Sequence, residues 1–277
     1  MNTEVMRRFY ARLVTSVPEA HPRLTEAFAT IKREEFVGSG PWQIPVQDGY
    51  MSTETDDPVV LYQDIGVGLI PERRINNGQP SLHALCMAAA SVQEGDVVIH
   101  IGAGTGYYTA ILASLVGPSG RVVAYEIDAE LARAATSNLA SYATVSVRRE
   151  SAVSADLPTA NVVYVSAGVT DLPANWLDAV APDGRLVVPL TPEWGLGGML
   201  LVTHHPTSHY AARMISTAGF IPCVGASDEH TAATLAAAFK SRSPEEIRSL
   251  RRGTEPDQSM WFAGDGWWLS TTEVGVR

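Results

Sequence analysis

Three glycines and one acid have the spacing of a site for a nucleoside-bearing cofactor. Gly102, Gly104 and Gly106 follow the apolar run VVIHI, and Glu126 follows the next apolar run, RVVAY, twenty positions after Gly106. Glycines let a backbone approach a ligand closely, and a carboxylate at this place can accept hydrogen bonds from both ribose hydroxyls. Strand, glycine loop, helix, strand and terminal acid together predict a cofactor site more strongly than a glycine turn alone.

The form of the loop favours S-adenosylmethionine over a dinucleotide. A dinucleotide loop reads G-x-G-x-x-G, because its pyrophosphate lies on a helix N-terminus. Here the loop reads G-x-G-x-G, and Tyr107 stands at the third glycine position of the dinucleotide pattern. S-adenosylmethionine carries a ribose and an amino acid but no phosphate, which suits this form. The contacts expected at the loop and the next strand are Gly102, Ala103, Gly104, Thr105, Gly106, Tyr107, Glu126 and Ile127.

The elements that must position these residues alternate between strand and helix. Such alternation predicts an α/β fold with a doubly wound, mostly parallel, Rossmann-like sheet. The strands are expected at 97–101, 121–125, 145–148, 162–166 and 185–190. The helices between them are expected at 107–116, 129–141 and 173–180. Two further strands, 200–205 and 210–216 around the turn HPTS, predict that the sheet ends in an antiparallel hairpin.

The flanking segments predict three parts of the chain: residues 1–80 as N-terminal helices and an acceptor-side cap, 81–225 as the cofactor-binding core, and 226–277 as an extension packed on it. Helices are expected at 4–17, 23–32, 81–92, 231–240 and 244–252. In the first of them, Val5, Phe9, Leu13 and Val17 keep helical spacing. Residues 38–80 are rich in Gly, Pro, Asp and Asn, and a long irregular stretch of this kind usually covers a functional site.

Composition excludes several classes of protein. With a formal net charge of −10 and no basic stripe, the chain is not expected to bind nucleic acid or an anionic membrane. Its two cysteines, Cys86 and Cys223, lie in apolar contexts and form neither a disulfide framework nor a zinc pattern. We expect two buried thiols, no metal, and a cytoplasmic protein whose N-terminus lacks the apolar core of a signal peptide.

Several segments resemble the protein-L-isoaspartate O-methyltransferase family, over about residues 23–225. They are the helix and Arg-x-x-Phe-Val signature in RLTEAFATIKREEFVG, the LYQD segment, the loop VVIHIGAGTGYYTAILA, the segment VVYVSAGVTDLPANWLDAVAPDGRLVVPL and the closing strand GFIPCVGA. The resemblance implies a class I methyltransferase fold and S-adenosylmethionine as methyl donor. It also implies that Asn77, Gly78 and His83 lie beside the cofactor.

The chain departs from the family at the acceptor side. The family's Thr-Ile-Ser before a proline reads Asn76-Asn77-Gly78 here, so the serine that the family places beside the acceptor carboxyl is Gly78. Its Gly-Asp-Gly after the third strand reads Glu150-Ser151-Ala152, which leaves Ser151 near the adenine. At the position before the loop where the family has an acid, this chain has His100. The resemblance therefore supports the cofactor and the fold more than it supports an isoaspartyl substrate.

Each remaining candidate has a structural alternative. His100 is expected to be a satisfied, partly buried histidine, and His204, His205 and His209 to lie on the surface. His83 is almost as well explained as a helix histidine without a role. Trp261, Trp267 and Trp268 form either an acceptor wall or, more commonly, a packed cap.

A carboxylate acceptor needs no base, whereas an amine must lose a proton to a nearby carboxylate, His or Tyr. Candidates for such a group are Asp56, Asp57, Tyr62, Asp64 and His83. Asp64 and Gly78 are the acceptor-side residues that we single out.

The first hypothesis is methyl transfer to an aspartyl or isoaspartyl carboxyl of a protein or peptide. The second is a methyltransferase of the same fold redirected to a small molecule or modified peptide, at oxygen or nitrogen. The third is a cofactor-binding scaffold without turnover.

Overall fold

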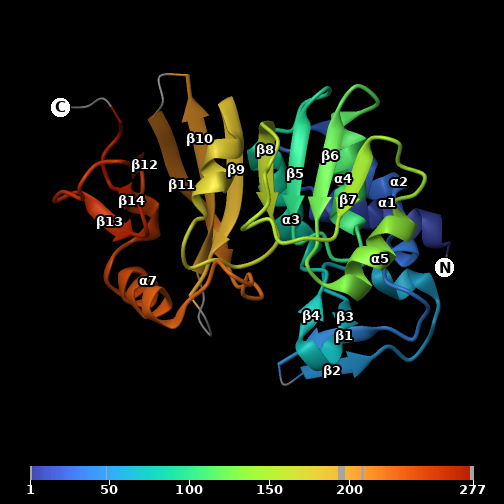
Figure 1. The fold of residues 1–277 in the computed structure, drawn as a ribbon. Coiled ribbons are helices and arrows are strands. Elements are labelled where there is room, and N and C mark those ends of the chain that lie inside the picture. The colour runs from blue at the N-terminus through green and yellow to red at the C-terminus, as the bar shows by residue number, and fades with distance from the viewer. Residues whose placement is uncertain (1, 48, 193–196, 207–208, 275–277) are drawn as a thin grey trace. The chain divides into compact units, whose positions relative to one another are not determined.

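The computed structural model describes residues 2–47, 49–192, 197–206 and 209–274, and the chain divides into two compact units (Figure 1). The first unit comprises Met1–Asp96 and Ala103–Arg149, and the second comprises Val97–Gly102 and Glu150–Arg277.

Helices of the first unit form where the sequence predicts them. They are α1 (Thr3–Val14), α2 (Pro22–Thr30), α3 (Pro80–Ala90), α4 (Tyr107–Val116) and α5 (Ala129–Asn138). Local signals fix their starts. Proline occupies the first helical position of α2 and α3, where a missing N–H costs nothing. Asp128 caps α5 by accepting from the N–H groups of Glu130 and Leu131.

Helix α1 buries a different face from the one that its apolar spacing marks. Val5, Phe9 and Leu13 are 60%, 63% and 56% exposed, whereas Tyr10 and Val14 are buried. Tyr10 packs against Phe28 and Tyr62, with ring centroids 6.2 and 5.6 Å apart. The helix has two apolar faces, and periodicity alone does not tell which of them packs.

The segment 38–80 consists of two small hairpins and short turns. The first hairpin is β1 (Gln43–Val46) with β2 (Gly49–Ser52), and the second is β3 (Gly68–Ile70) with β4 (Ile75–Asn76). The 3₁₀ turns of this unit are η1 (Arg33–Glu35), η2 (Pro58–Leu61) and η3 (Pro71–Arg73). Trp42, Leu61 and Val67 form a small core beneath the hairpins. The stretch expected to be irregular is thus ordered by its own packing.

Parallel strands occur in both units, as the alternating pattern predicts. In the first unit β6 (Arg121–Tyr125) pairs with β7 (Val145–Arg148). In the second unit β5 (Val97–Ile101), β8 (Ala160–Val165) and β9 (Val180–Leu190) pair in parallel, with the short helix α6 (Ala174–Ala179) between β8 and β9 in the chain. The fold is therefore a Rossmann-like α/β fold.

The second unit continues into the predicted antiparallel hairpin. It is formed by β10 (Gly197–His205) and β11 (His209–Ala218), and β10 also pairs with β9. Of the expected turn HPTS, Thr207 and Ser208 lie outside the described residues. His205 and His209 are exposed as expected, whereas His204 is half-buried and stacks on Tyr210.

The C-terminal extension joins this sheet, and the second helix predicted for it is wrong. After α7 (Glu229–Ser241), residues 244–252 form the turn η4 (Pro244–Glu246) and the strand β12 (Ser249–Arg252). Strands β13 (Met260–Ala263) and β14 (Trp267–Ser270) complete the order β13-β14-β12-β11. Leu250 lies between Tyr210 and Leu269 in the sheet. Strand partners distant in sequence override the helix propensity of EEIRSLRR.

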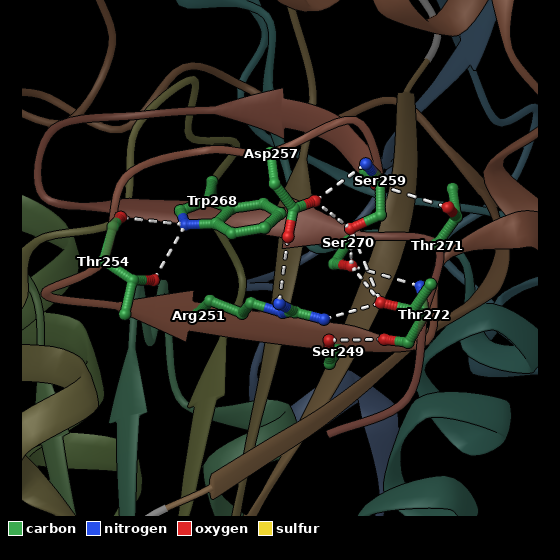
Figure 2. Close-up of polar contacts among 9 residues, drawn as sticks. All are labelled: Ser249, Arg251, Thr254, Asp257, Ser259, Trp268, Ser270, Thr271 and Thr272. Carbon is green, nitrogen blue, oxygen red and sulfur yellow. Dashed lines mark hydrogen bonds and ion pairs between the residues drawn. The ribbon is translucent and has the colours of Figure 1, made fainter. Parts of the chain in front are cut away.

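The tryptophans of the extension are packed inside it, which confirms the packed-cap interpretation. Trp261, Trp267 and Trp268 are all buried. Figure 2 shows Arg251 over the ring of Trp268, 4.9 Å from its centroid, while the indole N–H of Trp268 donates to the carbonyl of Thr254 at 3.1 Å. Beside them, two hydroxyl contacts join neighbouring strands. Ser249 of β12 donates to the carbonyl of Thr272, just after β14, and the hydroxyl of Ser259, just before β13, lies 2.7 Å from that of Ser270 in β14 (Figure 2).

The structure also shows how deeply the two cysteines are buried and whether a described helix could span a membrane. Cys86 is buried as expected, but Cys223 is only partly buried, because its loop lies at the surface beside the exposed Val224. Among the described residues, no helix has the length and apolar character that crossing a bilayer requires.

Candidate functional site

Glu126 follows β6 and turns its carboxylate toward the glycine loop. Oε2 accepts the N–H of Gly104 at 2.8 Å, and Oε1 accepts the N–H of Asp128 at 2.9 Å. The residue is 6% exposed. Burial raises the pKa of Glu126, and the two backbone donors offset part of that rise. Strand-end acid and loop backbone are therefore in direct contact, as the spacing predicts.

The loop needs glycine at its end. Gly106 has φ +99°, begins α4 as its N-cap, and a Cβ built on it would lie 2.7 Å from Leu139 Cδ1. Asn138 donates to the carbonyl of Thr105 at 2.9 Å, so the end of α5 also holds the loop. The buried hydroxyl of Thr105 has no hydrogen-bond partner within the described part of the chain. Ile127, which follows the acid, is 50% exposed.

Gly102 and His100 belong to the second unit and both contact Ser166. Gly102 has φ +77°, and a Cβ there would lie 3.3 Å from the Ser166 backbone. His100 is buried, and its Nε2 lies 3.0 Å from Ser166 Oγ. Burial lowers the pKa of His100 to about 3, so the ring is neutral at pH 7 and unsuited to act as a base. The expectation of a satisfied histidine is confirmed, but the ring is fully rather than partly buried.

The other predicted adenine-side residue, Ser151, also lies in the second unit. It is half-buried, and its hydroxyl accepts the N–H of Val153 at 3.3 Å. This bond closes a turn and leaves the hydroxyl proton available to a ligand.

The turn around Gly78 is fixed by its neighbours. Gly78 has φ +76°; its N–H donates to Asn76 Oδ1 at 2.8 Å, and its carbonyl accepts from the Tyr108 hydroxyl at 3.2 Å. The ring of His83 stacks on that of Tyr108, with centroids 3.6 Å apart. The backbone N–H of Gly78 is therefore already bonded to Asn76 and is not available to an acceptor carboxylate.

Asp64 caps a helix. Its carboxylate accepts the N–H and hydroxyl of Ser81 at 2.8 and 2.6 Å, and the side-chain amide of Gln79 at 2.8 Å. Ser81 lies in the first turn of α3, where an anion satisfies free N–H groups and meets the positive end of the helix dipole. The arrangement accounts for Asp64 as the residue that anchors α3 to the cap segment.

Arg33 is the important residue that reasoning from sequence did not single out as a site residue. Its guanidinium is fully buried and donates to the carbonyls of Leu61 (2.6 Å), Gln63 (3.2 Å) and Ile65. It also reaches Asn77 Oδ1 at 3.4 Å, which accepts the Val67 N–H at 2.8 Å. The available signal was its place at the head of the Arg-x-x-Phe-Val segment.

The charge of Arg33 is neutralised by carbonyl dipoles and aromatic rings. Its guanidinium carbon lies 5.9 Å from the ring centroids of both Tyr10 and Tyr107. Through these contacts Arg33 ties the cap segment to the first residue of α4. The Nδ2 of Asn77 is buried and unbonded within the described residues.

Known proteins resemble this chain over most of its length. The model of the protein-L-isoaspartate(D-aspartate) O-methyltransferase family matches residues 14–228, which leaves most of the C-terminal extension outside the match. A protein-L-isoaspartate O-methyltransferase of Protochlamydia amoebophila is 27% identical over 205 residues, 74% of this chain and 89% of that protein.

Two solved structures share the fold. A protein-L-isoaspartate O-methyltransferase, 22% identical, has a TM-score of 0.66 and matches 91% of this chain and 74% of its own. A putative one from Plasmodium falciparum, in complex with S-adenosyl-L-homocysteine, is 14% identical with a TM-score of 0.62, over 80% of this chain and 98% of its own. The chain belongs to the protein-L-isoaspartate(D-aspartate) O-methyltransferase family and is an S-adenosylmethionine-dependent methyltransferase.

Proposed function

We propose that the chain transfers a methyl group from S-adenosylmethionine to an aspartyl or isoaspartyl carboxyl of a protein or peptide. Membership of the family supports the reaction. The observation that carries the proposal is the contact between Glu126 and Gly104, because it sets an acid against a glycine loop as a ribose requires.

The residues present fit the cofactor. Glu126 would accept from the ribose hydroxyls, and Ile127 offers an exposed apolar side chain to the adenine. The glycines hold positive φ, so the loop backbone is open to close approach. The remaining proposed contacts, at the loop and at the acceptor side, are Gly102, Ala103, Thr105, Gly106, Tyr107, Ser151, Asn77, Gly78 and His83. Bound S-adenosylmethionine supplies a methyl already activated on sulfonium.

The residues of the chain contribute by aligning the acceptor with that methyl and by excluding water. Three of the five candidate bases for an amine acceptor have structural partners. Asp57 caps η2, Asp64 caps α3, and the hydroxyl of Tyr62 donates to Glu34 at 2.5 Å. Burial, with the bond to Glu34, raises the pKa of Tyr62 well above its usual value. This favours an acceptor that arrives deprotonated, which a carboxylate does at pH 7.

A redirected methyltransferase is the second candidate, and one observation favours it. At Gly78 the chain has neither the hydroxyl that the family places there nor a backbone amide without a partner. An acceptor other than an isoaspartyl carboxyl would account for both. A scaffold without turnover is the third candidate.

The proposal also covers the compartment, the partners and the parts of the chain. We propose a cytoplasmic enzyme whose acceptor is a protein, peptide or small molecule, with neither nucleic acid nor membrane as partner. We also retain the division into a cap segment (1–80), a cofactor-binding core (81–225) and an extension (226–277) as a proposal.

The test is methyl transfer to a panel of acceptors, followed by mass spectrometry. An isoaspartyl peptide should gain one methyl group that mild base removes, because esters hydrolyse and N-methyl groups do not. The matched aspartyl peptide, amines and modified peptides serve as comparison, and Glu126→Ala serves as the impaired enzyme. A base-stable methyl on an amine, with no ester formed, would replace the first proposal with the second.

A further inference from the structure

The space beside Gly78 is taken by the imidazole of His83. A Cβ built on Gly78 would lie 2.4 Å from His83 Nε2, closer than real Cβ contacts occur, and 3.1 Å from its Cδ2. Because Gly78 also holds φ +76°, a side chain at this position is disfavoured by the backbone and by the ring independently.

One tyrosine holds both members of this pair. The ring of Tyr108 lies flat against His83, at 3.6 Å and 14° between planes, and its hydroxyl donates to the Gly78 carbonyl at 3.2 Å. Tyr108 is almost fully buried, and burial raises its pKa, so the hydroxyl stays protonated as a donor. The imidazole cannot leave its place without giving up the stacking, and Gly78 cannot move without losing the hydroxyl.

We propose that Gly78 and His83 form a specificity-determining pair, in which the imidazole of His83 takes the place of a side chain at position 78 and limits the width of the acceptor end. This rests on the proposed function, which assigns Gly78 to the acceptor side. Compared with the family's serine, Gly78 does not leave an empty space at this position. A rigid aromatic ring from α3 fills that volume at a fixed position, with His83 only 3% exposed.

The first test is a double-mutant cycle on stability, which needs no turnover. Gly78→Ala should lower the melting temperature of the 277-residue chain by about 5–10 °C. The same substitution should cost at most half as much in a His83→Ala background, because the clash is gone and only the backbone strain remains. Gly38→Ala is the matched control: Gly38 has φ +69° with nothing within 4 Å of its Cβ, so its cost should be equal in both backgrounds. An equal cost of Gly78→Ala in both backgrounds would overturn the steric pair.

The second test measures selectivity. An isoaspartyl-glycine and an isoaspartyl-tryptophan peptide are compared as acceptors. Removal of the ring by His83→Ala should raise the ratio of kcat/KM for the tryptophan peptide over the glycine peptide about tenfold. His83→Asn, which keeps polarity in a smaller side chain, should raise it less. S-adenosylmethionine affinity from calorimetry separates loss of cofactor from a change of acceptor.

The outcomes are distinct. An equal fall of kcat/KM for both peptides in His83→Ala would refute the specificity pair and leave the proposed function standing. Wild-type protein that binds S-adenosylmethionine and methylates neither peptide would refute the proposed function itself. In that case the stability cycle still reports whether the ring and position 78 exclude each other.

Discussion

The glycine loop and the turn at Gly78 are built in opposite ways. The loop takes its shape from its own backbone, with glycines at positive φ and an acid from the next strand accepting the N–H of Gly104. The turn has one local bond, from the Gly78 N–H to Asn76, and is otherwise held by side chains distant in sequence, namely Arg33, Asp64 and Tyr108. The proposed cofactor side can therefore be predicted from residue spacing, whereas the shape of the proposed acceptor side depends on packing.

The largest expected effect is at Arg33. Arg33→Met keeps an apolar side chain of similar length but leaves the carbonyls of Leu61, Gln63 and Ile65 without their donor. We expect the free energy of unfolding to fall by about 3 kcal/mol or more, since each buried unpaired acceptor costs roughly 1–3 kcal/mol. Chemical denaturation measures the loss.

Hydrogen exchange of Arg33→Met tests the difference between the turn at Gly78 and the glycine loop. Residues 61–77 should exchange faster, while the loop at 102–106 keeps its protection. Equal acceleration in both segments would show that they are one cooperative element.

Gly106→Ala should be nearly as damaging, for a local reason. The added methyl meets Leu139 at 2.7 Å in a left-handed backbone. Overpacking and backbone strain together should cost about 2–4 kcal/mol, read from chemical denaturation. Gly38→Ala, which adds strain without a clash, should cost only about 1 kcal/mol. Similar losses in the two variants would mean that Leu139 yields and the loop is less constrained than its geometry indicates.

Glu126→Gln should weaken S-adenosylmethionine binding by about 1–3 kcal/mol, the worth of hydrogen bonds to a charged group. Calorimetry measures it, with Glu130→Gln on the exposed side of α5 as control. Unchanged affinity would remove Glu126 from the site.

The effect of Glu126→Gln on stability should depend on pH. Burial raises the folded-state pKa of Glu126, so its contribution to stability is present below the unfolded-state value of about 4.3 and is lost as pH rises through the folded-state value. Glu126→Gln should therefore raise the melting temperature of the ligand-free protein at pH 7 and raise it less at pH 4. The reverse order would contradict the assigned shift.

The smallest effect is expected in the extension. Trp267→Phe removes an indole N–H that donates to Asp171 at 2.6 Å, and it should cost about 1–2 kcal/mol of stability. Affinity for S-adenosylmethionine should stay within twofold by calorimetry. A larger change in affinity would show that the extension belongs to the cofactor site. The comparison between the glycine loop and the turn at Gly78 would then have to include the extension.

The sequence predicted most of what depends on local chemistry. Apolar runs placed the strands of the core. The order of strand, glycine loop, helix and strand predicted the contact between Glu126 and the loop, although the two are 22 positions apart. The sequence could not show that Asp64 caps α3 or that Arg33 donates to three carbonyls, since each contact joins segments far apart in the chain. The bond from the Gly78 N–H to Asn76 is local but was not predicted either. Residues 244–252 were misassigned because their strand partners are equally remote.

The most direct measurement of the central claim is a crystal structure with S-adenosyl-L-homocysteine bound. We expect the ribose hydroxyls within hydrogen-bond distance of the Glu126 carboxylate and the adenine against Ile127. A ribose bound away from Glu126, with that carboxylate still engaged only by Gly104 and Asp128, would contradict the claim that the glycine loop and the acid together hold the cofactor.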